Sequence, residues 1–399
     1  MHSVEQAIEE IRGAVRTLPP ETMLLSAAAG RLLAATVESQ VNLPGFDNSA
    51  MDGYAVRSED VRSASEDSPF PLKIIGEIPA GVAFDGVVGE GECARIFTGS
   101  PMPEGADAVV MQEDTERDGD TVKILDLARP LENVRLRGED VKLGEAIGRA
   151  GDRVNAGMLN LLSAAGCHEV TVHGRPVIGL LATGDELKTP PVPLAPGQIY
   201  ESNRVMLAAM VEHAGCEARV YELVPDQPDA TSRAIENAFE DCHAVITTGG
   251  VSVGEHDYVK AAFEALGGRL DFWKVRVKPG KPFVFGQLGS RLLFGLPGNP
   301  VSAFATFVVL VRPALLTWQG ANDSDLPTHP GVLGETLSNR GDRPHYVRVH
   351  VDANGTVRSA GVQASHMLHS LAHANGLVAV PPETSWESGR SVSVMRFDF

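Results

Sequence analysis

The sequence predicts a multidomain protein of the α/β plus β class, with a central, mostly parallel α/β domain and two β-rich parts. The chain has 399 residues, which is more than the roughly 100 to 200 residues typical of one domain. Between residues 176 and 318, apolar runs of strand length alternate with amphipathic runs of helix length, the pattern of repeated βαβ units. Residues 70–140 and 319–399 instead contain short strand-like runs separated by glycine turns.

The part of the chain before residue 173 is predicted to form two domains. Residues 3–15 have the pattern of a helix that begins with a capping box formed by Ser3 and Gln6. We expect residues 1–40 and 141–172 to form an elongated N-terminal domain. Residues 41–140 are expected to be a β-rich domain inserted into it.

The α/β domain is expected to comprise residues 173–318. Its alternating pattern predicts a largely parallel sheet that is covered by helices on both faces. Strands are predicted at residues 176–183, 216–224, 243–248 and 291–296. Helices are predicted at residues 202–215, with Ser202 as N-cap and Gly215 as terminator, and at residues 229–241, 257–268 and 301–311. In sheets of this kind, ligands bind beyond the carboxyl ends of the strands.

Residues 319–399 are predicted to form a small β-barrel. A hairpin is expected at residues 346–361, because Asn354 and Gly355 form a typical tight turn between two alternating runs. Further strands are expected at residues 376–382 and 391–399.

The composition indicates a cytoplasmic globular protein that binds neither nucleic acid nor membranes. The net charge of −18 repels polyanions unless a local basic patch overrides it. The first residues lack the basic and apolar runs of a signal peptide, and the longest strongly apolar stretch, Val301–Val311, stops at Arg312, too short to span a bilayer. The four cysteines lie far apart with no CxxC pair, so we interpret them as small buried apolar residues.

Acidic side chains follow three of the predicted strands. Glu186 lies in "TGDEL", Asp226 in "PDQPD" and Asp257 in "TGGVSVGEHD". Because the carboxyl ends of parallel strands share one edge of a sheet, we expect these carboxylates to converge, and such hard oxygen ligands favour Mg²⁺ shared with a phosphate. The alternative is that Asp257 caps the following helix and that the other two acids are solvated loop residues.

Cations gather in "DFWKVRVKPGKPFVFG". If residues 272–277 form a strand, Lys274, Arg276 and Lys278 share one face, while Trp273, Val275 and Val277 share the other. The following turn adds Lys281, so an anion site is indicated in an otherwise acidic chain. The alternative is a solvated edge strand, where lysines deter aggregation.

The turn "GLPGNPVSAF" is a second candidate for anion binding. Asn299 suits the N-cap and Pro300 the first position of a helix, which would leave the amides of Val301 and Ser302 free to face a ligand. A Walker P-loop and a GxGxxG element are both absent from the sequence. His366, His369 and His373 have helical spacing, but no carboxylate lies among them and we do not interpret them as a metal site.

Six segments form an ordered set along nearly the whole chain: "PGFDNSAMDGYAV", "TGSPMPEGADAVVMQED", "LATGDEL", "TTGGVSVGEHDYVK", "KPGKPF" and "GLPGNPVSAF". Together they closely resemble the molybdopterin molybdenumtransferase family, called MoeA in bacteria. The resemblance implies an elongated homodimer of four-domain chains, in which the α/β domain is of the MoaB and MogA type. It also implies an enzyme that takes adenylylated molybdopterin and molybdate, inserts molybdenum at the dithiolene with Mg²⁺ present, and releases AMP.

The resemblance assigns roles residue by residue. Asp52 and Thr98 belong to the substrate cleft, with Asp140 nearby, and Glu186, Asp226 and Asp257 hold Mg²⁺ and the nucleotide phosphates. Lys274 and Lys278 neutralise the pyrophosphate. Lys281, Ser302, Arg348 and Ser365 receive molybdate, and Pro297 and Pro300 shape the turn. The departure from the family pattern is the proline-rich spacer at residues 189–197.

Two other classes of protein share part of this pattern. A CinA-like enzyme that processes nucleotides or pterins would carry TGDEL and TGG, but would not need the "NSAMDGYAV" and "TGSPMPEGAD" segments. A non-enzymatic scaffold like the related domain of gephyrin is the third possibility, because one fold supports several roles. The expected partners are a second copy of the chain and the enzyme that adenylylates molybdopterin.

Overall fold

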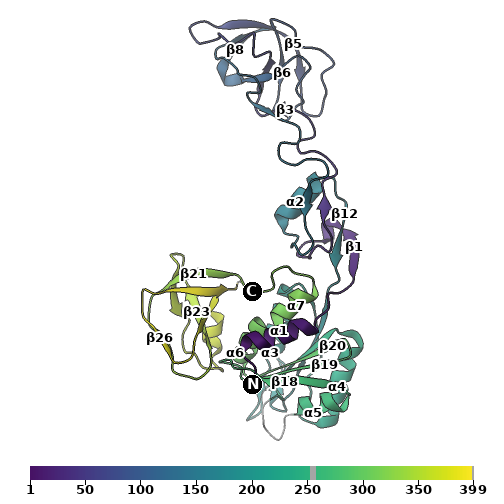
Figure 1. Ribbon diagram of the computed structural model, residues 1–399, viewed down its shortest axis with the longest axis vertical. Coiled ribbons are helices and arrows are strands. Elements are labelled where there is room, and N and C mark those ends of the chain that lie inside the picture. The colour runs from purple at the N-terminus through teal and green to yellow at the C-terminus, as the bar shows by residue number, and fades with distance from the viewer. Residues whose placement is uncertain (252–257, 398–399) are drawn as a thin grey trace.

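The computed structural model describes residues 1–251 and 258–397. Figure 1 shows an elongated molecule with a β-rich unit at one end and an α/β unit beside a β-barrel at the other. A narrow connecting unit joins the two ends, and the chain passes through it outward and then back. The predicted fold class is confirmed.

The α/β unit is built on a six-stranded mixed sheet. Its strands are β13 (Val177–Ala182), β16 (Glu217–Val220), β17 (Ala244–Thr248), β18 (Arg269–Lys274), β19 (Pro282–Leu288) and β20 (Arg291–Leu296). Their order is β16-β13-β17-β20-β19-β18. The first four strands are parallel to one another, and β19 pairs antiparallel with both β20 and β18. Sequence patterning found the four parallel strands, of which β13, β17 and β20 are largely buried on both faces while the edge strand β16 is not, and it missed β19.

Helices cover both faces of this sheet. They are α1 (Val4–Ala14), α3 (Asn203–His213), α4 (Pro228–Asp241), α5 (Tyr258–Ala265), α6 (Pro300–Thr306) and α7 (Arg312–Trp318). Helices α4 and α5 contact each other and pack over one core that contains Leu181 and Val245. Helices α1, α3, α6 and α7 share the larger core on the other face with Ile178 and Leu180, as expected from the alternation of side chains along β13. The predicted capping box of Ser3 and Gln6 is present at the start of α1.

The helix predicted at residues 301–311 is longer than expected. It begins as α6, passes through a π-helical turn at Phe307–Val311 (η3) and continues as α7 to Trp318. Pro313 has no N–H to donate, and the wider π turn just before it lets the helix continue instead of ending. In the described part of the chain, the helix Pro300–Trp318 is the one helix long and apolar enough to cross a membrane. However, 89% of its apolar stretch is buried inside the protein. It is therefore the core helix of the α/β unit.

The β-rich unit holds a six-stranded sheet of order β7-β4-β6-β5-β9-β8. Its strands are β4 (Gly53–Val56), β5 (Phe70–Ile78), β6 (Glu92–Ile96), β7 (Ala108–Met111), β8 (Thr115–Asp118) and β9 (Thr121–Ile124), and η2 (Gln112–Asp114) is a 3₁₀ turn. The short pair β3 (Asn48–Ser49) and β10 (Val134–Arg135) lies where the unit meets the connection (Figure 1). Gly53 is required here, because a Cβ would come within 1.9 Å of the carbonyl oxygen of Val110.

The connecting unit has a small core of its own, which includes Leu33, Leu162 and Val172. Its elements are β1 (Pro20–Leu24), η1 (Leu25–Ala27), β2 (Val37–Glu38), β11 (Ala146–Gly148), α2 (Ala156–Ala164) and β12 (Glu169–His173). Outgoing β1 and β2 pair antiparallel with returning β12 and β11, respectively.

The predicted C-terminal barrel is confirmed as a closed barrel of order β21-β24-β23-β25-β27. Its strands are β21 (Thr328–Leu333), β23 (His345–Val351), β24 (Thr356–Ser359), β25 (Gly376–Val380) and β27 (Ser391–Arg396), with β22 (Leu337–Asn339), α8 (Leu368–Ala372) and β26 (Thr384–Trp386) attached. The expected hairpin joins β23 to β24, and Gly355 supplies the positive φ of its turn.

The four cysteines are buried and unpaired, as the sequence analysis predicted. Burial raises the pKa of Cys93 and of Cys216 to about 12, because a thiolate is disfavoured away from water.

Candidate functional site

The loops that follow the parallel strands meet at one edge of the α/β sheet. The amide of Thr183 donates to the carbonyl of Thr248 at 3.1 Å, and that of Gly184 to Val224 at 3.3 Å. The amide of Gly249 donates to Leu296 at 3.2 Å, which brings in the loop after β20. The structure therefore joins loops that are more than 100 residues apart in the sequence.

Two of the three predicted carboxylates belong to these joined loops. The amide of Asp226 donates to the carboxylate of Asp185 at 3.2 Å, so the loop of Asp226 contacts the loop of Glu186. The Glu186 carboxylate lies against Gly184, where a Cβ would approach Oε2 to 2.6 Å. Asp257 lies outside the described residues. Within the described ranges, no group of three or more histidine, cysteine or carboxylate side chains is placed to hold a metal ion.

Buried polar groups that the sequence analysis did not single out lie at the same edge. Asn203, at the start of α3, donates from Nδ2 to the carbonyl of Gly298 at 2.8 Å, while its Oδ1 is buried without a hydrogen-bond partner. The Thr183 hydroxyl is likewise buried and unpartnered. Burying such groups costs free energy unless something bonds to them, so they mark where a polar ligand fits. Their sequence signals were the Thr of TGDEL and the Asn of "ESNR".

The proline-rich spacer after TGDEL forms a rim on this edge. It lies between two short strands, β14 (Leu187–Lys188) and β15 (Ile199–Tyr200), which pair parallel. Rim side chains are exposed although they are apolar, including Ile199 at 54% and Tyr200 at 45% of full exposure.

The cation-bearing segment differs from the predicted strand. Strand β18 ends at Lys274, its pairing with β19 shifts register, and Trp273 is 48% exposed while Val275 and Val277 are fully buried. The expectation that Trp273 shares a face with Val275 and Val277 was therefore wrong, because the register shifts break the period of two. From Lys274 to Lys278 the burial follows the predicted alternation, with Val275 and Val277 buried and the three cations partly or fully exposed.

The turn that follows brings Lys278 and Lys281 between the α/β unit and the barrel. The Lys278 amide donates to Pro344 at 2.9 Å, and the Tyr346 amide donates back to the Lys278 carbonyl at 2.8 Å. Gly280 has φ of +108°, and a Cβ there would lie 2.3 Å from the Thr306 methyl on α6. Only glycine lets the turn pack so closely on this helix.

The "GLPGNP" turn has the predicted backbone but not the predicted free amides. Asn299 occupies the N-cap position and Pro300 the first turn of α6. However, the Val301 amide donates to the Ser365 carbonyl at 3.3 Å and the Ser302 amide to the Asn299 carbonyl at 3.0 Å. The expectation that both amides face a ligand was wrong, because the segment before α8 reaches the Val301 amide and the Ser302 amide bonds within its own turn.

Arg348, another of the predicted site residues, is deeply buried, at 1% exposure. Its Nε donates to the Ser370 hydroxyl at 3.1 Å, and its Nη2 to the carbonyls of Val362 and Ala364 at 2.9 and 3.2 Å. Its Nη1 is buried without a partner, and burial lowers the pKa of the guanidinium. Arg348 therefore holds the segment that ends in Ser365.

Five of the predicted anion-binding residues thus come from elements that contact one another. The turn of Lys278 and Lys281 touches α6, α6 carries Ser302, and the start of α6 bonds to Ser365. Pro297, also predicted for this region, is buried directly after β20 and precedes Gly298. Lys274 lies at the end of β18, where its carbonyl accepts the amide of His2.

Asp52 and Thr98 form a second site in the β-rich unit. The amide and the hydroxyl of Thr98 both donate to Oδ1 of Asp52 at 2.8 Å. These two bonds, with a smaller contribution from Arg95, lower the pKa of the Asp52 carboxyl, so it remains a carboxylate at neutral pH. The Arg95 guanidinium lies over the rings of Tyr54 and Phe97, 5.1 and 5.0 Å from their centres.

Within one chain, this second site lies far from the acids of the α/β unit, at the opposite end of the molecule (Figure 1). Asp140 is exposed, and its amide donates to the Leu43 carbonyl at 3.0 Å. A single chain therefore brings Asp52 and Thr98 together but does not bring them to Glu186.

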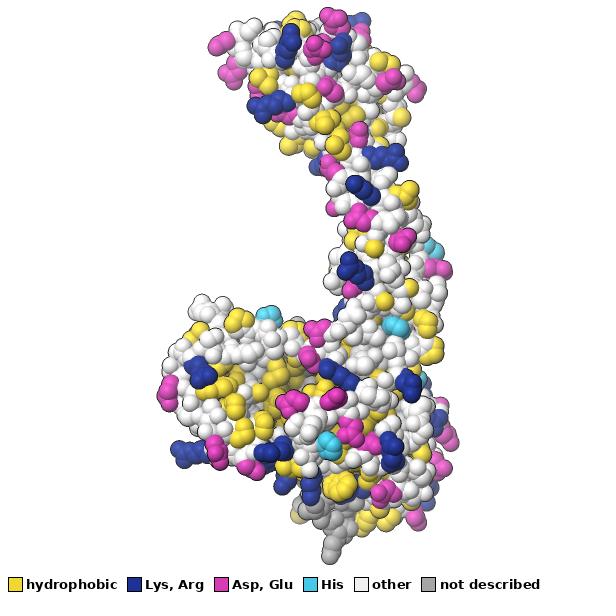
Figure 2. Space-filling view, viewed as in Figure 1, with side chains coloured by type: hydrophobic (Ala, Val, Ile, Leu, Met, Phe, Trp, Pro, Cys, Tyr) yellow, Lys and Arg dark blue, Asp and Glu magenta, His cyan; other side chains and the backbone are white. Residues whose placement is uncertain are grey.

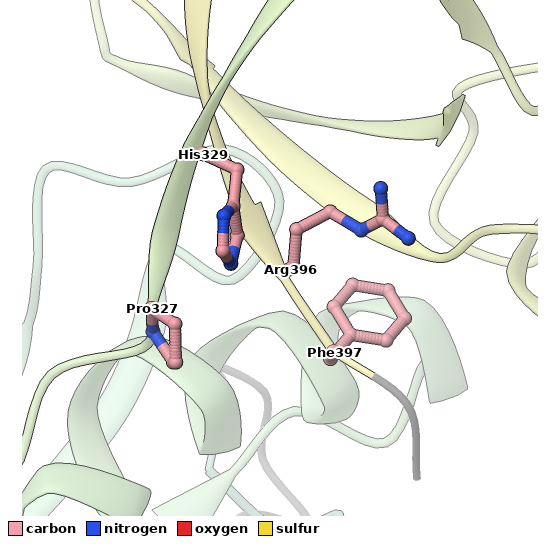
Figure 3. A pocket seen from close by; sticks show the side chains of 4 residues that line it. All are labelled: Pro327, His329, Arg396 and Phe397. Carbon is pink, nitrogen blue, oxygen red and sulfur yellow. The ribbon is translucent and has the colours of Figure 1, made fainter. Parts of the chain in front are cut away.

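A pocket of about 390 Å³ lies at the foot of the barrel, lined by Pro327, His329, Arg396 and Phe397 (Figure 3). Figure 3 shows His329 on β21 beside Arg396 on β27, with Pro327 just before the first strand and Phe397 just after the second. None of the predicted site residues lines this pocket, so it is separate from the candidate site.

The fold and the site define a class: a multi-unit protein whose mostly parallel α/β unit ends in acidic and glycine-rich loops and is joined to a small barrel across a cation-bearing turn. Family models match three stretches, described as "MoeA N-terminal region (domain I and II)" at residues 2–166, "Probable molybdopterin binding domain" at residues 179–317 and "MoeA C-terminal region (domain IV)" at residues 330–397. The chain belongs to the molybdopterin molybdenumtransferase family.

Relatives match over nearly the full length. The molybdopterin molybdenumtransferase of Nostoc is 38% identical over 94% of this chain and 88% of its own, and that of Haemophilus influenzae is 37% identical over 95% and 94%. A crystal structure of the molybdopterin biosynthesis protein MoeA from Pyrococcus horikoshii superimposes with a TM-score of 0.86 at 30% identity, covering both chains completely.

Proposed function

We propose that this chain is a molybdopterin molybdenumtransferase, which inserts molybdenum from molybdate into adenylylated molybdopterin and releases AMP. One observation carries the proposal: the loops of Glu186 and Asp226 meet at the sheet edge, and this edge continues through Gly298 to a turn that carries Lys278 and Lys281. A phosphate-bearing substrate and a tetrahedral oxyanion need this combination of acids and cations. Relatives with full-length similarity carry the same name.

The donor set suits Mg²⁺. Glu186 and Asp226 offer carboxylate oxygens from adjoining loops, and Mg²⁺ is bound through one or two carboxylates together with substrate phosphates. When bound, the ion would neutralise charge that develops as AMP leaves. Asp257 is proposed as the third acid of this set. Lys274 and Lys278 are proposed to bind the pyrophosphate, and the buried Asn203 and Thr183 oxygens would orient the ligand.

Molybdate is proposed to bind at the joint between the α/β unit and the barrel. Arg348 directs an unpaired Nη1 into this buried region, and it fixes the segment of Ser365 against α6. Lys281 and Ser302 come from the neighbouring turn and helix, while Pro297 and Pro300 set the backbone path. A buried guanidinium and hydroxyl, with a lysine beside them, stabilise an oxyanion without a metal.

The test is AMP release by the purified protein with adenylylated molybdopterin, molybdate and Mg²⁺. Glu186→Ala and Asp226→Asn are expected to lower turnover by at least about 100-fold while the melting temperature changes little, because loop acids contribute to chemistry more than to the core. Glu222→Gln, an exposed acid in the chain just before Asp226, is the matched control. Wild-type-like turnover in both acid variants would refute the metal site.

A homodimer is proposed to complete the site. In one chain, Asp52 and Thr98 lie far from Glu186, and exposed apolar side chains flank both places: Phe46, Met51 and Leu136 near the first, and Ile199, Tyr200 and Val205 near the second. Figure 2 shows hydrophobic side chains gathered on the part of the β-rich unit nearest the connection. A two-fold axis would let the β-rich unit of one chain face the acids of its partner.

Subunit exchange tests this arrangement. Inactive Asp52→Ala protein mixed with inactive Glu186→Ala protein should regain activity, since one heterodimer site then has both residues. Demonstrated exchange without recovered activity would mean that each chain builds its own site.

The division into domains, the location and the supply of substrate are also proposals. We propose the boundaries 1–40 with 141–172, 41–140, 173–318 and 319–399. Each of the four units contains a hydrophobic core, which supports this division, although α1 and the barrel residues Tyr346, Leu377 and Phe397 join the core of the α/β unit. We further propose a cytoplasmic enzyme that receives its substrate from the molybdopterin adenylyltransferase. The CinA-like alternative loses support because the matched family region at residues 2–166 is one that it does not need.

A further inference from the structure

We propose that Arg204 is a positioning residue that holds the two acid-bearing loops at the distance the Mg²⁺ site requires. The inference rests on the proposed function, because it assigns Arg204 a role in building the site of Glu186 and Asp226. Arg204 lies in the first turn of α3 and is 6% exposed. No site motif of the sequence includes it.

Arg204 forms a buried ion pair with Glu201. Its Nε donates to Glu201 Oε2 at 2.9 Å, and its own backbone amide donates to Oε1 at 2.9 Å. The two side chains are 7% and 4% exposed, whereas each of the other ion pairs found among the described residues has at least one partner whose side chain is 32% or more exposed. Glu201 thereby also caps α3, a role expected of Ser202, whose side chain makes no capping bond.

The remaining donors of the guanidinium reach two other segments. Nη1 donates to the carbonyl of Tyr221, and Nη2 donates to the Thr189 hydroxyl at 3.4 Å. Tyr221 directly follows β16 and opens the loop that leads to Asp226. Thr189 directly follows β14, which begins one residue after Glu186.

The bonds of Arg204 thus connect the segments that carry both acids. Strand β15 ends one residue before Glu201 and pairs with β14, and the Ile199 amide donates to the Glu186 carbonyl at 2.9 Å. Two sets of hydrogen bonds therefore connect the loop of Glu186 to the loop of Asp226. One passes through the guanidinium of Arg204, and the other is the bond from the Asp226 amide to the Asp185 carboxylate. Outer partners of this kind orient the ligands of a metal.

Stability alone does not account for the arrangement. A buried ion pair contributes little net stability, since the cost of removing two charges from water offsets their attraction. The planar fork of arginine, however, bonds to Glu201, Tyr221 and Thr189 in three directions at once. Lysine, a single point charge on a flexible chain, retains the charge but not this geometry. Arg204→Lys therefore separates a role of the buried charge in stability from a role of the guanidinium in positioning the loops.

The experiment measures Mn²⁺ binding in the presence of AMP by the electron paramagnetic resonance signal of the free ion, because Mn²⁺ occupies the same oxygen sites as Mg²⁺. Wild type, Glu186→Ala and Arg204→Lys are compared, and the Mg²⁺ concentration for half-maximal AMP release is measured in parallel. Arg219→Met is the matched control, since Arg219 makes a comparable but exposed pair with Glu217 on β16. A double variant, Glu201→Gln with Arg204→Met, leaves no unpaired buried charge and serves if Arg204→Lys does not fold.

We expect Arg204→Lys to weaken Mn²⁺ binding and to raise the half-maximal Mg²⁺ concentration by about 10- to 100-fold, with recovery of kcat at saturating Mg²⁺. The double variant should behave alike, and Arg219→Met should match wild type. A melting temperature that falls while Mn²⁺ affinity stays within about twofold would make Arg204 merely structural and overturn the inference alone. Absence of any Glu186-dependent Mn²⁺ binding in wild type would overturn the proposed metal site and this inference together.

Discussion

Acid sensitivity of the C-terminal barrel should come largely from one buried histidine. His345 is the first residue of β23, pairs with Val380 and is 5% exposed, and both of its ring nitrogens are buried without a hydrogen-bond partner. Burial, reinforced by the charges of Lys278 and Arg348, lowers the pKa of His345 to about 4. The imidazole is therefore neutral in the folded barrel at neutral pH.

The size of the effect follows from the two pKa values. In the unfolded chain the imidazole binds a proton below its ordinary pKa of 6.5, whereas the folded barrel leaves it neutral down to about pH 4. The unfolded state then binds more protons, so stability is lost as the pH falls from 6.5 toward 4. Integrating this difference between pH 7 and pH 5 gives a loss of about 2 kcal/mol from His345.

Hydrogen exchange of the amides in β23 and β25, corrected for intrinsic rates, measures the opening free energy of the barrel at both pH values. Wild type should lose about 2 kcal/mol more than His345→Leu between pH 7 and pH 5. His329→Leu, which changes an exposed histidine of the same barrel, should retain the wild-type loss. An equal loss in wild type and His345→Leu would refute the reasoning, since the imidazole would then be protonated in the folded state.

Three further outcomes are expected. Gly280→Ala should destabilise the protein by about 1 to 3 kcal/mol in denaturant titrations, because its methyl would lie 2.3 Å from Thr306 at a positive φ; unchanged stability would mean that the turn moves freely. Cys93 and Cys216, with pKa values of about 12, should resist Ellman's reagent at pH 8 until urea is added. Because the folded protein keeps these thiol protons while the unfolded chain loses them, the free energy of unfolding should fall as the pH rises above 9. Lys278→Ala should weaken AMP binding about tenfold in calorimetry, and an unchanged affinity would favour a solvated edge.

Much of the α/β unit could be predicted from the sequence because its signals are local. Strands β13, β17 and β20 are largely apolar runs, and glycines such as Gly215, with φ of +88°, end the helices of this unit. The same holds for the hairpin at Gly355 and for the capping box at Ser3. Each of these features depends on residues a few positions apart, so the sequence alone is enough to predict it.

Predictions from local patterns failed where a contact with a distant element decides the exposure or the hydrogen bonding of a residue. The alternation of residues 273–278 predicted two clean faces, but the shifted pairing of β18 with β19 left Trp273 exposed. The Val301 amide looked free because its partner, the Ser365 carbonyl, comes from the other side of the α/β-barrel joint. The sequence contains no nearby signal for either outcome.

The sequence by itself determined the fold class, the family and which loops carry acids and cations, since the order of strand, loop and helix sends each loop to a known edge of the sheet. Only the tertiary structure decided which groups actually meet. It buried Arg348 against the segment that leads to Ser365, joined the loops of Glu186 and Asp226 through the amides of Gly184 and Asp226, and left the Asp52 site at the opposite end of the molecule. The physical reason is that contacts between distant segments depend on packing and on the partners left over for each buried polar group, and these are fixed only once all the units have folded.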